Sequence, residues 1–217
     1  MSRCPRRRRI RAQRSGSPTR ACTRRSSSVA RRPATRARTC FSGRSPTLVT
    51  HVSDVAELAL EIGRYLGLAE HDLVQLGHVG ELHDVGKVAI PDAILEKQGP
   101  LDPSEWAFVH QHTLIGERII GAASALLPVA RMVRSTHERW DGLGYPDGLS
   151  GEAIPLVARI VTACDALSAM VSERPYRDAV GLPVALDELD RCAGMQFDRD
   201  VVAAIRCVLT RSDELAA

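Results

Sequence analysis

Aromatic residues make up only 4% of this 217-residue chain, whereas apolar residues make up 44%. A core has to be built mostly from Leu, Val, Ile and Ala, which suits packed helices. No segment alternates apolar and polar residues for long, so the pattern of half-buried strands is missing. No apolar run approaches the ~18 residues of a membrane span, and there is no apolar core of a signal peptide. These absences predict an all-α protein of the cytoplasm, with no membrane contact.

Cysteine is scarce and irregularly spaced. The six cysteines stand at positions 4, 22, 40, 164, 192 and 207, and no CxxC pair occurs. This spacing argues against a zinc framework and against a disulfide scaffold. We expect free thiols in a reducing compartment.

Acidic residues are absent from residues 1–45, which hold 15 arginines. The remaining residues, 46–217, carry 14 Lys and Arg against 26 Asp and Glu, a net charge of −12. The Arg/Ser-rich segment has too little apolar surface to offset the entropy of ordering. An arm that binds nucleic acid and an organellar transit peptide are alternatives, but Phe41 is its one aromatic residue for base stacking. We favour a disordered basic tail over residues 1–45, native or from a misassigned start, and one domain over 46–217.

Apolar residues in the second part recur at helical spacing, and helix-capping residues and breakers separate the segments. We predict a single bundle of about seven helices. The expected helices cover residues 45–66, 70–83, 102–120, 123–138, 155–172, 181–192 and 198–211, with a short turn of helix at 90–95. Residues 140–151 contain five Gly or Pro residues and predict a long loop.

His83 and Asp84 end the second of these helices, and Gly86 and Lys87 follow them. An imidazole and a carboxylate side by side are ligands that divalent transition metals accept. The pair alone could equally be a helix end with a favourable histidine. Three further histidines (His51, His112 and His137) and Asp165, which stands in an apolar stripe, come from other helices and the helix end at residue 137. Ligands spread over separate helices are typical of a dinuclear site in a helical bundle.

The chain resembles the HD-GYP family of the HD phosphohydrolase superfamily. The matching segments are ELHDVGKVAIPDAIL (81–95), HTLIG (112–116), HERWDGLGYPDGLSGEAIPLVARIVTACDAL (137–167), ERPYR (173–177) and GMQFDRDVV (194–202). The resemblance implies a helical, metal-dependent phosphodiesterase that hydrolyses cyclic di-GMP to pGpG, with GMP as a further product left open. It also implies two divalent transition-metal ions, with iron or manganese favoured.

The resemblance assigns roles to individual residues. It places His51, His83, Asp84, His112, His137 and Asp165 at metal-ligand positions. Asp84, shared by two cations, and Lys87, beside the scissile phosphate, are the catalytic candidates. Tyr145 is expected to offer a ring face for stacking, and Arg174 and Arg177 are expected to bind phosphate or a guanine edge.

Three positions depart from the family pattern. Thr136 stands where the first of two adjacent histidines is usual, Thr47 where some members have a glutamate, and Ser168 where an aspartate is frequent. Thr47 and Ser168 favour two metals over three. Thr136 replaces an imidazole with a poor ligand, which weakens the second metal position and the activity.

Two other functions stay open. A degenerate HD-GYP domain could bind cyclic di-GMP or a protein partner without turnover, and Thr136 is the reason to consider it. A protein that binds nucleic acid through residues 1–45 is the other alternative, which we regard as the weaker one. For partners, the resemblance points to cyclic di-GMP, and it leaves open GGDEF-type or other signalling proteins and a homodimer.

We predict that deletion of residues 1–44 leaves stability and turnover unchanged, because this segment has no apolar face to dock. Thermal unfolding, metal analysis and turnover of cyclic di-GMP by the truncated and full-length chains measure this. Insolubility or metal loss in the truncated chain would show that the segment belongs to the fold.

Overall fold

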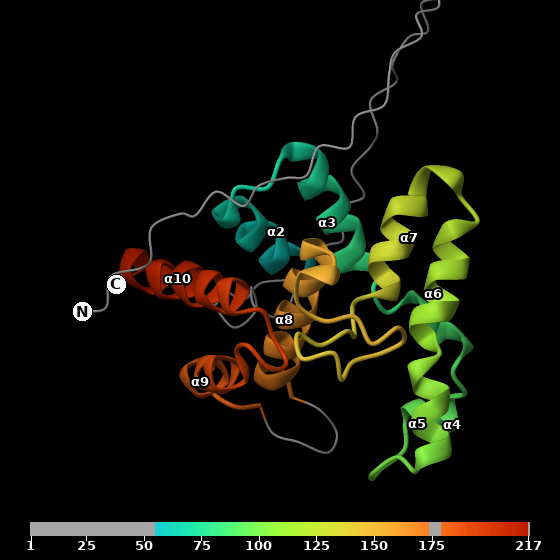
Figure 1. Ribbon diagram of the computed structural model, residues 1–217. Coiled ribbons are helices and arrows are strands. Elements are labelled where there is room, and N and C mark those ends of the chain that lie inside the picture. The colour runs from blue at the N-terminus through green and yellow to red at the C-terminus, as the bar shows by residue number, and fades with distance from the viewer. Residues whose placement is uncertain (1–54, 174–178, 217) are drawn as a thin grey trace, which may run out of the picture. The chain divides into compact units, whose positions relative to one another are not determined.

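The computed structural model describes residues 55–173 and 179–216, with side chains as far as Arg211 (Figure 1). The predictions for residues 1–45, Thr47, His51, Arg174 and Arg177 fall outside the described residues. Within these ranges the chain forms α-helices and short 3-10 helices, and the one β-type pairing is an isolated bridge between Ala193 and Phe197. The all-α prediction is confirmed.

The longest connection between successive α-helices joins α7 to α8. The α-helices are α2 (Val55–Leu66), α3 (Glu70–Leu82), α4 (Asp92–Leu95), α5 (Pro103–His110), α6 (His112–Gly121), α7 (Leu127–Arg134), α8 (Leu156–Val171), α9 (Leu182–Cys192) and α10 (Arg199–Ala216). The 3-10 helices are η1 (Val85–Ala89), η2 (Ser124–Leu126) and η3 (Gly151–Ala153).

Helix α8 lies at the centre of the core. Nine of its 16 residues are buried, and a helix that is apolar around most of its circumference has to be enclosed by others. Helices α2, α3, α7, α9 and α10 pack against it. Asp165 is therefore held on the most enclosed helix of the described fold.

Helices α2 and α3 form a hairpin whose buried faces meet on α8. Gly80 lets the two helices approach closely, because a Cβ there would lie 2.7 Å from Cα of Ala56. The hairpin fixes the end of α3, where His83 follows directly.

Helix α6 packs against α7 and against η1, and the contact with η1 is made at Gly86. A side chain at Gly86 would collide with the carbonyl oxygen of His112 and would lie 2.7 Å from the backbone nitrogen of Gly116. The absence of a side chain therefore lets the segment after Asp84 lie directly on the first turn of α6.

Two predicted helices differ from the structure. The helix expected over 102–120 follows the capping residue Asp102 but is interrupted at Gln111, which separates α5 from α6. In place of the helix expected over 123–138, α7 has Pro128 in its first turn and ends at Arg134. Proline suits a first turn because its missing N–H has no partner there in any helix.

The state of three cysteines and the character of the helices bear on the thiol and membrane predictions. Cys164 and Cys192 are free thiols, as expected, but Cys207 is disulfide-bonded, so the expectation of free thiols is wrong at that position. Among the described residues, no helix combines the length and the apolar character needed to cross a membrane.

We predict that Gly86→Ala lowers the free energy of unfolding by about 1–3 kcal/mol, as for other overpacked sites, and lowers the affinity for Mn²⁺. Gly77→Ala on α3 is the matched control, since its new methyl group would lie 3.7 Å from Leu60 and helical Gly→Ala changes are neutral or stabilising. Denaturant unfolding and Mn²⁺ titration measure both effects. Equal behaviour of the two variants would mean that the contact at Gly86 is not needed.

Candidate metal centre

His83 directly follows α3 and is 8% exposed. Its Nδ1 lies 2.8 Å from the carbonyl oxygen of Gly80. A carbonyl can only accept a hydrogen bond, so Nδ1 carries the proton and Nε2 faces the site. Nε2 lies 3.5 Å from Oδ2 of Asp84 and 3.8 Å from Oδ1 of Asp165.

His112 begins α6 and is oriented in the same way. Its Nδ1 donates to the carbonyl oxygen of Val109 at 2.6 Å, and its ring is 1% exposed. Nε2 lies 3.6 Å from Oδ1 of Asp84 and has no hydrogen-bond partner in the described part of the chain. A backbone carbonyl that holds Nδ1–H is the usual outer support of a histidine that binds metal through Nε2.

His137 lies after α7, and its ring meets that of His112 edge-on, with the centroids 4.7 Å apart. Its Nε2 is buried and lacks a hydrogen-bond partner among the described residues. Burial, with a smaller contribution from the charge of His112, lowers the pKa of His137 to about 4. The imidazole is therefore neutral at pH 7, which is the form that a metal ligand needs.

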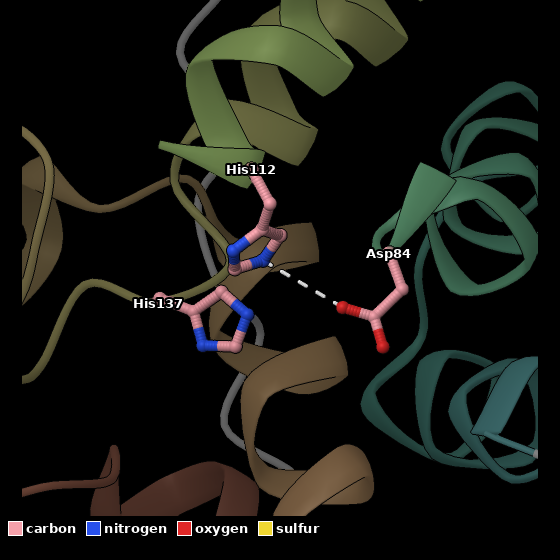
Figure 2. Close-up of side chains that lie close together, drawn as sticks. All are labelled: Asp84, His112 and His137. Carbon is pink, nitrogen blue, oxygen red and sulfur yellow. Dashed lines mark ion pairs between the residues drawn. The ribbon is translucent and has the colours of Figure 1, made fainter. Parts of the chain in front are cut away.

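Asp84, His112 and His137 form one group, in which one ligand atom of each residue lies within 4.8 Å of the others. Figure 2 shows the imidazoles of His112 and His137 beside the carboxylate of Asp84, with a dashed line joining His112 to Asp84. Oδ1 of Asp84 is also buried without a hydrogen-bond partner in the described residues. Three buried, unpaired polar atoms around one point are costly, and a divalent cation would satisfy all three. The residues therefore fit a metal ion.

His83 and Asp165 extend this group on the Oδ2 side of Asp84. Burial lowers the pKa of His83, but the ion pair with Asp165 and the charge of Asp84 outweigh it and raise the pKa above its usual value. Burial alone would raise the pKa of Asp165, and the pairing with His83 lowers it instead. The carboxylates thus favour a positive charge at this position. Five of the six predicted ligand residues converge, and the sixth, His51, lies outside the described residues.

Lys87 lies one turn beyond the pair, and its Nζ donates to Oδ2 of Asp84 at 2.6 Å. Its side chain is 41% exposed, so the ammonium group lies at the open side of the site. The structure places Lys87 beside the candidate metal ligands, and its catalytic role stays a prediction.

Tyr145 contacts the metal centre through its ring. It stacks on His137, with the ring centroids 5.2 Å apart and an interplanar angle of 4°. It also stacks on His110, with a centroid distance of 3.9 Å and an interplanar angle of 19°. Burial and the charges of Asp84 and Asp165 raise the pKa of its phenol. The open ring face expected from the sequence is absent in this arrangement. His110 escaped the sequence analysis because its contact with Tyr145 joins residues 35 positions apart in the chain.

The loop after His137 is held by buried polar groups that sequence reasoning also missed. Glu138 is 2% exposed, and its carboxylate accepts the backbone N–H groups of Asp147 at 2.7 Å and Leu149 at 3.0 Å. Gly144 packs on Glu138, where a Cβ would lie 2.5 Å from Cα of that residue. The guanidinium group of Arg134 donates two hydrogen bonds of 2.7 Å to the carboxylate of Asp147. These bonds hold Tyr145 over His137, and an acidic residue next to a ligand histidine is the signal that could have suggested them.

Thr136 is 2% exposed and stands next to His137. Its hydroxyl donates to the carbonyl oxygen of Val133 at 2.9 Å, and its own carbonyl accepts from Thr162 at 2.6 Å. The side chain therefore closes the end of α7, and its hydroxyl proton is already used there.

The fold and the site agree with what comparison with known proteins shows. The family model described as "HD domain" matches residues 35–201. A 3'3'-cGAMP-specific phosphodiesterase 3 of Vibrio cholerae is 36% identical over 166 residues, which is 76% of this chain and 36% of the relative. A cyclic di-GMP phosphodiesterase of Thermotoga maritima is 39% identical over 156 residues, 71% of this chain and 42% of the relative.

Among solved structures, a cyclic GMP-AMP-specific phosphodiesterase of V. cholerae superposes with a TM-score of 0.60 at 21% identity. The match covers 77% of this chain and 45% of the other, and it supports the fold alone. This chain spans less than half the length of the two curated relatives. The helical core with clustered His and Asp side chains defines an HD-domain protein. The chain belongs to the HD domain family, in its HD-GYP branch.

We predict that Thr136→His raises the metal stoichiometry towards two and increases occupancy at limiting Mn²⁺. A neutral imidazole is a far better ligand than a threonine hydroxyl, and ~1.4 kcal/mol of added binding energy corresponds to about tenfold in affinity. Metal analysis after dialysis, and Mn²⁺ titration, compare the variant with the wild type. Two tightly held metals in the wild type, or an unchanged stoichiometry in a folded Thr136→His variant, would refute this account of the substitution.

Proposed function

We propose that this chain is a metal-dependent phosphodiesterase that opens cyclic di-GMP to linear pGpG, and chromatography of the products shows whether a second cut to GMP follows. The observation that carries the proposal is the set of buried, unpaired ligand atoms on Asp84, His112 and His137. Family membership and the named activities of the relatives support it. We further propose two metals, iron or manganese, and the cytoplasm as the location.

A bound divalent metal would supply Lewis acidity towards a phosphate oxygen and would lower the pKa of water. The residues prepare for this in distinct ways. His112 and His137 offer neutral nitrogen atoms at pH 7, since burial lowers the pKa of both. Asp84 offers two carboxylate oxygens that face different neighbours, His112 on one side and His83 on the other.

We propose that Lys87 neutralises negative charge on the phosphate. Its ammonium group lies 2.6 Å from Oδ2 of Asp84 and is partly exposed. An ammonium group in this position can neutralise the charge that develops on a phosphoryl oxygen in the transition state. Arg174 and Arg177 remain proposed contacts for the second phosphate or a guanine edge, and Tyr145 a proposed nucleotide contact.

The relatives also support 3'3'-cGAMP as a second candidate substrate. One relative is named for 3'3'-cGAMP and another for cyclic di-GMP, at similar identity. The two cyclic dinucleotides share their phosphates and differ in one base, so the metal centre cannot distinguish them. Parallel turnover assays with both compounds decide which one this chain prefers.

Binding without turnover is the rival function, and Thr136 is its basis. Metal-loaded protein that binds cyclic di-GMP but releases no linear product would favour it. Binding of nucleic acid by residues 1–45 would instead appear as salt-dependent affinity of the isolated segment. A homodimer and GGDEF-type or other signalling partners stay part of the proposal.

We predict that Asp84→Asn abolishes turnover of cyclic di-GMP and reduces bound Mn²⁺ without unfolding the domain, because one carboxylate serves both sides of the site. Asp92→Asn is the matched control, since Asp92 is exposed at the start of α4. Chromatography of products, metal analysis and thermal unfolding give the three readouts. Wild-type turnover by purified Asp84→Asn would overturn the proposed site.

A further inference from the structure

His110 and Tyr145 form the closest ring contact of the described aromatic pairs. Their centroids are 3.9 Å apart and their planes differ by 19°. At that separation the imidazole covers the centre of one face of the phenol ring. His137 is also parallel to Tyr145, at 5.2 Å and 4°. Two rings on the same face of Tyr145 would lie side by side in contact with each other, but His110 and His137 form no ring contact among the described aromatic pairs, so His137 covers the opposite face.

The three rings therefore form a sandwich with Tyr145 in the middle. Its outer layers come from different parts of the chain, His110 from the end of α5 and His137 from the turn after α7. Trp106, one turn earlier on α5, also contacts His110, with the ring centroids 5.6 Å apart and the planes tilted by 50°. His110 thus joins α5 to the loop that carries Tyr145 and, through Tyr145, to a candidate metal ligand.

His137 is the member of the metal group that most needs such support. His83 and His112 are each held by a bond from Nδ1 to a backbone carbonyl. Ring contacts with Tyr145 and His112 are what orient the imidazole of His137. Stacked aromatic pairs favour a defined offset and angle, so a fixed Tyr145 fixes the plane in which His137 presents Nε2.

We propose that His110 is a positioning residue of the metal centre. By stacking on Tyr145 it holds that ring against His137 and so orients the imidazole of His137. A direct consequence concerns the nucleotide. With both faces covered, Tyr145 can contact a cyclic dinucleotide through its ring edge and its hydroxyl group, and a base cannot stack on it. The inference concerns metal binding and stands apart from the proposed reaction.

The test uses His110→Ala and His110→Phe in the full chain, with Mn²⁺ as the probe. His110→Phe keeps an aromatic layer, whereas His110→Ala removes it. His78→Ala is the control, because His78 is an exposed histidine on α3 away from these rings. We expect His110→Ala to weaken Mn²⁺ affinity roughly two- to tenfold, the range for loss of one aromatic pair, and His110→Phe to restore it.

Ring signals of labelled tyrosine give a second readout that does not depend on metal or turnover. The chain has three tyrosines, and Tyr145→Phe identifies the signal of Tyr145. His110→Ala should change the chemical shift of the Tyr145 signal, because one stacked ring is lost, and should leave the signal of Tyr65 unchanged. An unchanged Tyr145 signal, unchanged Mn²⁺ affinity in folded His110→Ala, or failure of His110→Phe to restore the affinity would each overturn the inference.

Discussion

The contact between Gly86 and the first turn of α6 is the constraint on which the metal centre depends. Asp84 precedes Gly86 by two residues, and His112 contributes the carbonyl that a side chain at Gly86 would strike. Backbone packing thus brings Oδ1 of Asp84 to 3.6 Å from Nε2 of His112. Helix α3 is itself fixed by its close crossing with α2 at Gly80 and by burial against α8. The geometry of the site follows from two glycines and a buried central helix.

Carbonyl groups at the ends of helices orient two of the histidines. His83 and His112 each donate Nδ1–H to a carbonyl three residues earlier, in the last turn of α3 and of α5. Carbonyls in a last turn have unused capacity to accept hydrogen bonds. A histidine placed just after a helix therefore finds a fixed acceptor for one nitrogen and turns the other towards the site. His137 follows α7 but has a ring contact in place of such a bond.

The sequence pointed to candidate metal ligands because the residue types that bind metals can be recognised without tertiary information. The adjacent His83 and Asp84 at a helix end, and a carboxylate at Asp165 within an apolar stripe, need no tertiary information to be noticed. His51, His112 and His137 were candidates from their places in the predicted helices, and the HD-GYP resemblance then placed all three at metal-ligand positions. The contacts of His110 with Tyr145 and of Glu138 with the loop could not be predicted, because they depend on how distant segments pack. The same holds for the interruption at Gln111, where the helical pattern continues through the break.

The two oxygens of Asp84 meet unlike surroundings, and this bears on how many metals the site can hold. Oδ1 faces His112 and, among the described side chains, has no cation against it. Oδ2 faces the ammonium group of Lys87 at 2.6 Å and the imidazole of His83, whose pKa is raised. His112 would offer a neutral nitrogen to a metal at Oδ1, whereas Lys87 and the proton of His83 would oppose a metal at Oδ2. We therefore expect the two positions to differ in metal affinity for electrostatic reasons, in addition to any effect of Thr136, which stands where the family pattern has an imidazole.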